Sequence, residues 1–339
     1  MILQLSSLFP LILLATVLSF ILSPLSIIAS KRLGLIDRPG SAPHKLHAHP
    51  TPLAGGLVLI LSILLVFFSL GPDPDRTSIV ILAGTAGMGL LGLLDDRYQF
   101  MPLPKLLGQI ALATLLIAFG VKVQITGVQP VDMILTYLWV IGLTNAFNFV
   151  DSIDGLALGL GGIAAAFFML VTIDSNQPLL ASLSATLVGA SVGCFFFAVT
   201  PARLFLGDSG ALALGFFLAS IGISYTPGEA DLPQALTWFI PILVLGVPIF
   251  DMTLVIIHRL RSGLPIYRGG MDHTYHRLKA IGLDTSRAIL AMQITAIILG
   301  LISFIVLDAS ILIANLAFGL VVLLGIGMVI YFEWKAPPR

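Results

Sequence analysis

Charged residues are scarce in this chain of 339 residues, because lysine, arginine, aspartate and glutamate together make up only 10% of it. Soluble domains carry roughly 25%, so the chain has too few charges to cover a surface that faces water. This scarcity excludes a soluble enzyme, a disordered segment and a coiled coil. The 17 basic and 17 acidic residues cancel, which gives no support for nucleic-acid binding. The single cysteine, Cys194, excludes a disulfide within the chain.

Apolar residues take the place of the missing charges. They form 58% of the sequence, and the mean hydropathy is +1.05. A membrane-spanning helix needs about 20 mostly apolar residues. Eleven runs meet or approach that length, at about 8–30, 53–70, 78–94, 105–120, 131–150, 157–173, 179–199, 211–225, 235–257, 286–307 and 310–332. The sequence therefore predicts an all-α, polytopic membrane protein with about eleven transmembrane helices, in which residues 1–339 form a single integral membrane domain.

The distribution of basic residues predicts the orientation. The first of them, Lys31, follows the first apolar run instead of preceding it, so this run is expected to be an uncleaved helix and not a signal peptide. Cytoplasmic loops are enriched in lysine and arginine. If 31–52 is such a loop, the N-terminus lies outside, the C-terminus is cytoplasmic, and of the 17 basic residues only Arg76 and Lys122 fall outside. We predict a multi-pass protein of the inner (plasma) membrane.

Acidic residues divide between the two predicted sides. Those of the outer loops, such as Asp132, read as solvated loop charges, and Asp251 lies in or near the inner end of the ninth run. Five others cluster at cytoplasmic helix ends: Asp95, Asp96, Asp151, Asp154 and Asp208. A carboxylate at membrane depth is costly unless it is paired, hydrated or bound to metal. The cluster is therefore the candidate site, although each acid taken singly is compatible with a loop side chain reaching water.

Adjacent carboxylates close the third run in Gly92-Leu-Leu-Asp-Asp-Arg97. Asp95 and Asp96 repel each other, which raises one pKa unless a cation neutralises them. The pair suits a divalent metal, a general base, or both. The alternative is an ordinary exposed loop.

Polar residues recur every three positions at Asn145, Asn148, Asp151 and Asp154, just before Gly155. On a helix they would follow one stripe. Their amide and carboxylate oxygens are hard ligands that suit Mg²⁺. The alternative is a hydrogen-bonded seam between two helices.

A third motif, Phe205-Leu-Gly-Asp-Ser-Gly210, precedes the eighth run. Its glycines let backbone approach a ligand closely, Asp208 can complete a metal site, and Phe205 can stack on a base. The alternative is a plain turn in which Asp208 or Ser209 caps the next helix.

Two cytoplasmic loops combine histidines with cations. The longer loop, 258–285, contains His273, His276 and Arg277, and the first loop contains Lys45 between histidines. Arginine and lysine suit phosphate binding, while histidine can bond to phosphate or sugar or transfer protons. Taken together, one face holds the residues needed for Mg²⁺-assisted chemistry on a phosphate substrate, and the apolar surroundings suit a lipid co-substrate.

These motifs, in this order, resemble the polyprenyl-phosphate N-acetylhexosamine-1-phosphate transferases, a family that includes the phospho-MurNAc-pentapeptide transferases. The resemblance covers residues 31–285 by motif and extends to the eleven-span plan. It implies a Mg²⁺-dependent phosphotransferase, with Mn²⁺ able to substitute, that moves HexNAc-1-phosphate from a UDP-sugar to undecaprenyl or another polyprenyl phosphate and releases UMP. This is the first membrane step of cell-envelope polysaccharide synthesis. A homodimer is plausible by the same analogy.

The resemblance also implies roles for individual residues. The catalytic residues would be Asp95 and Asp96, one of them acting as base or, in a two-step scheme, as a covalent nucleophile, together with His276. The residues implied for metal binding are Asp208, Asp151 and Asn148. Those implied for binding the nucleotide, sugar or phosphates are Lys45, Lys105, Asn148, Asp154, Phe205, Gly207, His273 and Arg277.

Several positions depart from the family pattern. Leu53 and Ala54 precede the first glycine pair where arginine is common, Ser152 stands where glycine is frequent, and Tyr275 replaces one histidine. The lack of three consecutive histidines favours a GlcNAc-type donor over muramyl-pentapeptide. Two other classes are weaker alternatives. A secondary transporter would place its ionisable groups near the membrane midplane, and a CDP-alcohol phosphotransferase would need a longer motif after Asp154-Gly155.

Overall fold

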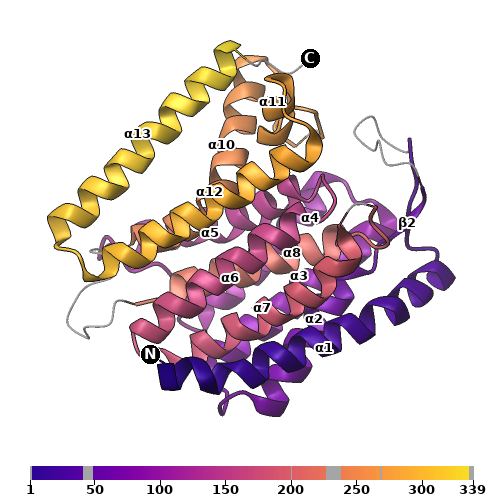
Figure 1. Ribbon diagram of the computed structural model, residues 1–339, viewed down its shortest axis with the longest axis horizontal. Coiled ribbons are helices and arrows are strands. Elements are labelled where there is room, and N and C mark those ends of the chain that lie inside the picture. Colours follow the sequence, from indigo (N-terminus) through magenta and orange to yellow (C-terminus); the bar gives the residue numbers. More distant parts are fainter. Residues whose placement is uncertain (1, 41–48, 200, 227–237, 268, 336–339) are drawn as a thin grey trace.

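Helices make up most of the structure. The computed structural model describes residues 2–40, 49–199, 201–226, 238–267 and 269–335. In chain order the helices are α1 (Ile2–Leu33), α2 (Gly55–Leu70), α3 (Arg76–Tyr98), α4 (Pro102–Ala118), α5 (Gln129–Val150), α6 (Leu156–Asp174), α7 (Pro178–Ala198), α8 (Gly207–Ser224), α9 (Phe239–Val244), α10 (Gly246–Arg261), α11 (Thr274–Ala280), α12 (Thr285–Ile305), the short 3-10 helix η2 (Val306–Asp308) and α13 (Ile311–Lys335). Two short strands, β1 (Ile36–Asp37) and β2 (Thr51–Pro52), pair antiparallel (Figure 1).

Each predicted apolar run contains helix. Within the described residues, eight helices are long and apolar enough to cross a membrane: α1, α3, α5, α6, α7, α8, α12 and α13. The helices α2 and α4 are apolar but shorter. The prediction of a helical, polytopic membrane protein is confirmed, while the count of eleven spans and their orientation stay predictions.

The ninth predicted run, 235–257, is not a single helix. Its described part forms α9, which ends at Val244, and α10, which begins at Gly246. Pro248 has no N–H to donate to the carbonyl of Val244, and its ring crowds that carbonyl. The break therefore sets the inner residues of the run, Asp251 among them, on a separate helix that continues to Arg261.

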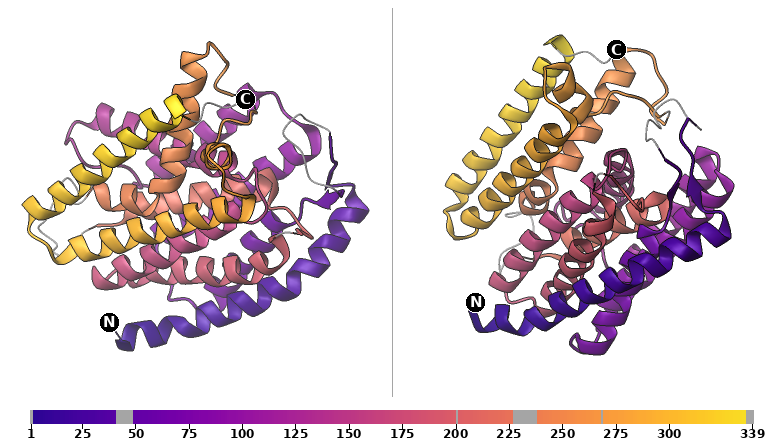
Figure 2. Two further views of the ribbon diagram at one scale, coloured as in Figure 1. Left: turned by 45° about the horizontal axis from the view of Figure 1, so that its top comes forward. Right: turned by 45° about the vertical axis from the view of Figure 1, so that its right-hand side comes forward.

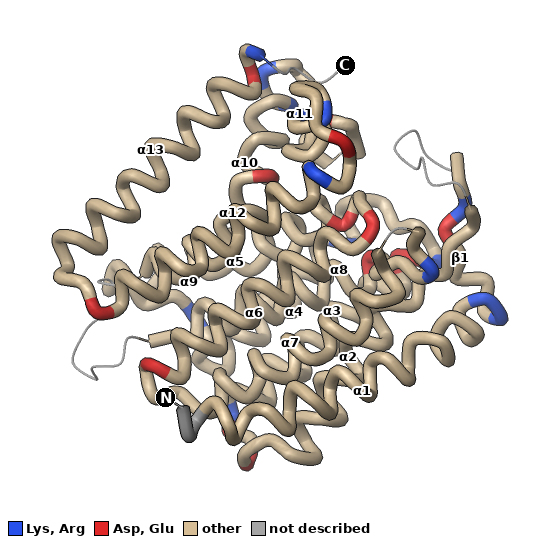
Figure 3. Tube along the Cα trace, viewed as in Figure 1, with Lys and Arg blue, Asp and Glu red and all other residues tan. Residues whose placement is uncertain are grey.

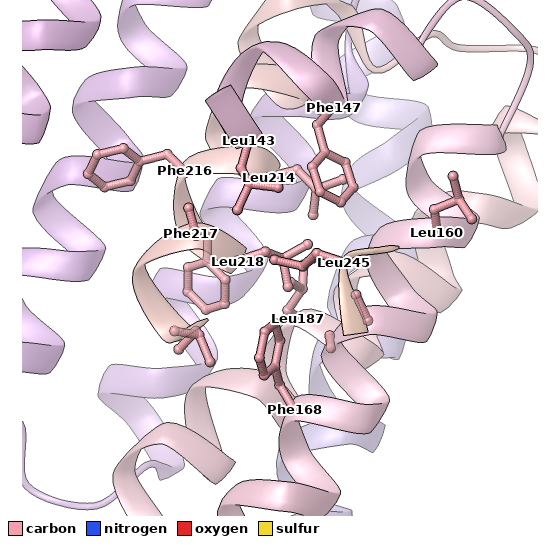
Figure 4. Close-up of a cluster of buried hydrophobic side chains, with 14 of the residues drawn as sticks. Leu143, Phe147, Leu160, Phe168, Leu187, Leu214, Phe216, Phe217, Leu218 and Leu245 are labelled. Atoms are coloured by element: carbon pink, nitrogen blue, oxygen red, sulfur yellow. The ribbon is translucent and has the colours of Figure 1, made fainter. Parts of the chain in front are cut away.

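Helix α8 forms the centre of the bundle. Sixteen of its 18 residues are buried, and it packs against α2, α3, α5 and α6. Figure 4 shows Leu214 and Phe217 of α8 among the side chains of this core, which include Leu143 and Phe147 of α5, whereas Phe216 points away from them; its ring lies against Gly84 of α3. A helix that is apolar all round must be enclosed by protein or by lipid, and α8 is enclosed by protein.

Helices α12 and α13 lie at the outside of the bundle (Figures 1 and 2). Only Ala314 and Phe332 are buried in α13, although its sequence is as apolar as that of the core. This exposure is what a helix surrounded by lipid requires, and it agrees with a membrane-embedded chain.

Charged residues concentrate at the ends of the helices. Figure 3 shows most of the lysines and arginines at the end of the bundle that carries β1 and α11. At the opposite end, Asp132 differs from the sequence prediction, because it is only 6% exposed. Its Oδ1 accepts hydrogen bonds from the amides of Thr126 at 3.0 Å and Ile125 at 3.3 Å. Asp132 thus fixes a loop to α5 and is not a solvated charge.

Candidate active site

A cavity of about 880 Å³ opens where α3 and α5 end and α8 begins. Residues from distant parts of the sequence line it. Those expected from the sequence are Asp95, Asp96, Asn148, Asp151, Asp154, Phe205, Gly207, Asp208, His273 and His276. We call Asp95, Asp96, Asp151, Asp154 and Asp208 the aspartate cluster. Lys105 reaches it by bonding to two of its members, and Lys45 lies outside the described residues.

Two glycines allow α3 and α8 to meet backbone to backbone. A Cβ atom on Gly92 would overlap the main chain of Asp208 and Ser209. Gly207 has a φ of +71°, which side chains disfavour, and a Cβ there would lie 2.8 Å from Oδ2 of Asp96. Both glycines are therefore required for the close approach that puts Asp96 beside Asp208.

Asp96 caps the first turn of α8 from another helix. Its Oδ1 accepts from the amide of Asp208 at 3.0 Å and its Oδ2 from the amide of Ser209 at 3.1 Å. A carboxylate at a helix N-terminus satisfies free amides and interacts favourably with the helix dipole. The Gly-Asp-Ser-Gly motif thus forms the first turn of α8 instead of preceding it, and neither Asp208 nor Ser209 is its cap.

Lys105 of α4 bonds to the aspartate cluster. Its ammonium group lies 2.9 Å from Oδ2 of Asp95 and also contacts Asp208. With its amide oriented to suit its neighbours, Asn148 donates to Oδ1 of Asp208 at 3.0 Å and accepts from Lys105 at 3.1 Å. Burial, together with the charges of Asp208, Asp96 and Asp154, raises the pKa of Asp151 well above its usual range. Lys105 therefore does not fully offset the mutual repulsion of these acids, and the raised pKa favours the protonated form of Asp151.

The predicted metal ligands, Asp208, Asp151 and Asn148, lie together at the cavity. Their carboxylate and amide oxygens are the donors that Mg²⁺ prefers. No group of three or more histidine, cysteine or acidic side chains within the described residues is arranged to hold a metal ion. The ammonium group of Lys105 bonds to Asp208 and Asn148, so a metal ion there would have to share or replace it.

The polar stripe is helical only in part. Helix α5 ends at Val150, Asp151 follows as its C-cap, and Asp154 lies in the turn before α6. Asn145 instead exchanges hydrogen bonds with Gln109 of α4, at 2.8 and 3.3 Å. The continuous stripe was therefore wrong, because the chain turns away, and Asn145 belongs to the helix–helix seam that was the alternative.

Residues 269–280, which we call the histidine loop and which include α11, close one side of the cavity. Nδ1 of His273 lies 2.9 Å from Oδ2 of Asp251. The ring of His276 packs against Tyr275, with 3.8 Å between ring centroids. Burial and the neighbouring His273 lower the pKa of His276 to about 4, so its imidazole is neutral near pH 7. The two histidines therefore differ in their surroundings: His273 is bonded to a carboxylate, whereas His276 is neutral and packs against a tyrosine.

The side chain of Arg277 does not line the cavity, although His273 and His276 do. Its guanidinium is fully buried, donates to Glu333 at 2.6 Å and to the carbonyl of Phe332 at 3.1 Å, and so fixes α11 to α13. The expectation that it engages sugar and diphosphate with His273 and His276 does not match this placement. The arginine pairs with an acid at the far end of the sequence, which no local motif signals.

Sequence reasoning did not identify Asp251 or Arg259 as part of this region. Arg259 makes a bidentate bond to Asp272, at 2.7 and 2.9 Å, and lines the cavity. Asp251 was noted only as an acid in an apolar run. Its 22-residue separation from His273 carries no pattern that predicts their contact.

Comparison with known proteins gives consistent matches. The sequence model of "Glycosyl transferase family 4" matches residues 78–226. That stretch contains the whole aspartate cluster and Lys105, whereas the histidine loop lies beyond it.

Sequence similarity to known proteins extends over most of this chain. A "probable undecaprenyl-phosphate N-acetylglucosaminyl 1-phosphate transferase" of Bacillus subtilis is 30% identical over 83% of this chain and 79% of its own length. A "decaprenyl-phosphate N-acetylglucosaminephosphotransferase" of Mycobacterium tuberculosis is 31% identical over 83% and 77%, respectively. A "phospho-N-acetylmuramoyl-pentapeptide-transferase" of Staphylococcus carnosus is 27% identical over 85% and 95%.

Proposed function

The chain belongs to glycosyl transferase family 4, and we infer that it transfers N-acetylglucosamine 1-phosphate from a UDP-sugar to a polyprenyl phosphate. The products are the polyprenyl diphosphate sugar and UMP. The observation that carries this function is the similarity, over 83% of the chain, to relatives named for polyprenyl-phosphate N-acetylglucosamine phosphate transfer. The acid-lined cavity supplies a site of suitable size and chemistry for a nucleotide sugar.

The proposed reaction is a direct displacement. An oxygen of the lipid phosphate attacks the phosphorus that carries the sugar, and the bond to the UMP oxygen breaks. Asp95 takes the proton of the lipid phosphate where one is present. Asp96, whose oxygens both accept amides of α8, holds the first turn of α8 in place. Lys105, already bonded to Asp95 and Asp208, neutralises charge on the diphosphate.

We propose that Mg²⁺ is the cofactor, held by Asp208, Asp151 and the amide oxygen of Asn148. Mg²⁺ usually takes one or two protein carboxylates together with substrate phosphates, so a protein set that becomes complete only with substrate is consistent with this proposal. When bound, the ion stabilises negative charge on the diphosphate and on the departing UMP.

The remaining cavity residues divide between the two ends of the donor. Phe205 and Asp154 are proposed to receive the uracil, and His273 and His276 the sugar and diphosphate. His276, with its pKa lowered to about 4, acts as a neutral hydrogen-bonding group in this scheme.

Orientation and location complete the proposal. Most basic residues lie at the cavity end of the bundle, and cytoplasmic ends are enriched in such residues. We therefore propose that the cavity faces the cytoplasm in the plasma membrane. By the resemblance to the family alone, we also propose that two chains form a homodimer. A transporter is not favoured, because the acids gather at helix ends instead of near the middle of the spans.

A thin-layer assay tests this function. Purified protein in detergent receives Mg²⁺, undecaprenyl phosphate and radiolabelled UDP-GlcNAc, with UDP-GalNAc and UDP-MurNAc-pentapeptide in parallel. We expect a labelled lipid and equimolar UMP from UDP-GlcNAc, both lost with EDTA. No lipid product from any donor, with folded protein, would contradict the function. Leaving out the lipid tests the direct mechanism, since one equivalent of UMP per enzyme would instead indicate a covalent intermediate.

A further inference from the structure

The carboxylate of Asp251 is fully buried beside the cavity and has no role in the scheme above. It comes from α10, but both of its oxygens accept from the start of α11. Oδ2 lies 2.9 Å from Nδ1 of His273, and Oδ1 accepts from the amide of Thr274 at 2.6 Å. One side chain thus fixes both the first turn of α11 and the imidazole that precedes it.

This contact determines which ring nitrogen of His273 carries the proton and which one is left for a ligand in the cavity. An ionised carboxylate can only accept hydrogen bonds, so Nδ1 of His273 must carry the proton. Nε2 is then the nitrogen on the opposite edge of a ring that lines the cavity. Phe149 meets the same ring edge-on, with 5.9 Å between centroids. The orientation of the imidazole is therefore fixed from α10 and from α5.

A capping role alone does not account for Asp251. Asp284 performs such a role for α12, accepting from the amide of Arg287 at 2.8 Å with a side chain that is 58% exposed. Asp251 instead belongs to a different helix from the one it caps and is buried, where an unpaired charge is costly. Its second oxygen bonds to the cavity histidine.

We propose that Asp251 is a positioning residue for the transfer. It holds His273 in the tautomer and direction in which Nε2 faces the sugar diphosphate of the nucleotide donor. This inference rests on the proposed function for its substrate, but the Asp251–His273 pairing itself does not. In metal sites, removing a carboxylate that orients a metal-binding histidine lowers metal affinity or activity by roughly 10- to 100-fold.

The variant Asp251→Asn tests the pairing with little change of shape. Its amide oxygen can still accept from Thr274, while its NH₂ group meets Nδ1, which must then accept and pass its proton to Nε2. We expect kcat/KM for UDP-GlcNAc to fall by about 10- to 100-fold, with the KM for undecaprenyl phosphate unchanged.

A double-mutant cycle separates positioning from support of α11. In a His273→Gln background, Asp251→Asn should cause no further loss of kcat/KM, because there is no imidazole to orient. An equal loss in both backgrounds would overturn the proposal. Asp132→Asn is the matched control, since Asp132 is also a buried carboxylate that accepts loop amides. It is expected to lower thermal stability while leaving kcat/KM unchanged.

A readout independent of activity follows the proton itself. In protein labelled with ¹⁵N-histidine, the signals of His273 are identified by their loss in His273→Gln. They should show Nδ1 protonated in the wild type and a shift of the proton to Nε2 in Asp251→Asn. A wild-type proton on Nε2 alone would overturn the inference. A wild type that transfers no sugar but shows the Nδ1 proton would contradict the proposed function and leave the pairing intact.

Discussion

Two groups of charged residues lie at or near the cavity, and they are neutralised to different degrees. The aspartate cluster brings five acids together at the ends of α3 and α5 and the start of α8, with Lys105 bonded to two of them. The second group, which we call the paired group, joins each of three acids to basic partners. Its pairs are Asp251 with His273, Asp272 with Arg259, and Glu333 with Arg277, and Glu333 also contacts His258 and Arg261.

This difference separates chemistry from support. The paired group fixes α10, α11 and α13 to one another and has little charge left to offer a ligand. The aspartate cluster is incompletely neutralised, so it gains most from an added cation. A buried charge that lacks a partner costs free energy, and a protein retains such a cost where a ligand offsets it. The contrast therefore predicts opposite responses when one acid is neutralised in each group.

The largest effect is expected in the aspartate cluster, from Asp208→Asn. Removing this charge should lower kcat by about 10²–10³ or more. It should also remove the rise in apparent Tm that Mg²⁺ is expected to give the wild type. Asp174→Asn, at the exposed end of α6, is the control and should behave as the wild type. Full activity of Asp208→Asn at saturating Mg²⁺ would contradict the role given to Asp208.

A smaller effect, on stability, is expected in the paired group from Glu333→Gln. The side chain of Glu333 is 8% exposed and bonds to Arg277, whose guanidinium is buried. Breaking one partner of a buried pair costs about 3–5 kcal/mol, so the apparent Tm in detergent should fall by several degrees.

The matched control is Arg261→Gln. Arg261 contacts the same Glu333 at 3.4 Å, but its side chain is 66% exposed. An exposed pair contributes about 1 kcal/mol or less, so this variant should change the Tm little. Equal losses in both variants would show that burial does not distinguish the two contacts.

The change in thermal stability should have the opposite sign for Asp151→Asn when it is measured in EDTA. Burial and neighbouring acids raise the pKa of Asp151, so the folded state binds a proton more readily than the unfolded chain, and stability falls as pH rises. The variant should therefore be more stable than the wild type by a few degrees, more so at pH 8 than at pH 5. It should also be inactive, and saturating Mg²⁺ should erase its advantage.

For Asp272→Asn we expect the opposite change, a loss of stability instead of the gain expected for Asp151→Asn. Burial opposes ionisation of Asp272, but the hydrogen bonds and charge of Arg259 hold its pKa below its usual value. The stability that this acid contributes is present above its unfolded pKa and is lost as pH falls through the folded value. The variant should thus be less stable at pH 8, by an amount that shrinks at low pH. A gain in Tm for Asp272→Asn, or a loss for Asp151→Asn, would remove the contrast between the groups.

The two groups also differ in how far the sequence predicted them. The aspartate cluster lies in short local motifs, and its members were identified before the structure because carboxylates at helix ends are unusual in an apolar chain. The sequence could not show that Asp96 caps α8 or that Asn145 bonds to Gln109, since both are contacts between helices. His273 and Arg277 of the paired group were also identified from the sequence, but the pairings with their acids were missed for the same reason, because the partners are 13 to 56 residues apart.

The smallest effect is expected between these two groups, where α11 approaches the turn that follows α5. The phenol of Tyr275, in α11, is close enough to the side chain of Ser152, next to Asp151, for the two to interact. Burial raises the pKa of Tyr275 to about 12, so its phenol stays protonated.

A double-mutant cycle checks this contact. Tyr275→Phe and Ser152→Gly should each cost about 1 kcal/mol or less, and each should lower kcat/KM for UDP-GlcNAc less than tenfold. Because each substitution removes the same interaction, the double variant should be no worse than the more impaired single variant. Strictly additive losses would mean that the two residues act independently. A coupled result would instead show that the two residues act together and that α11 is linked in this way to the turn between α5 and α6.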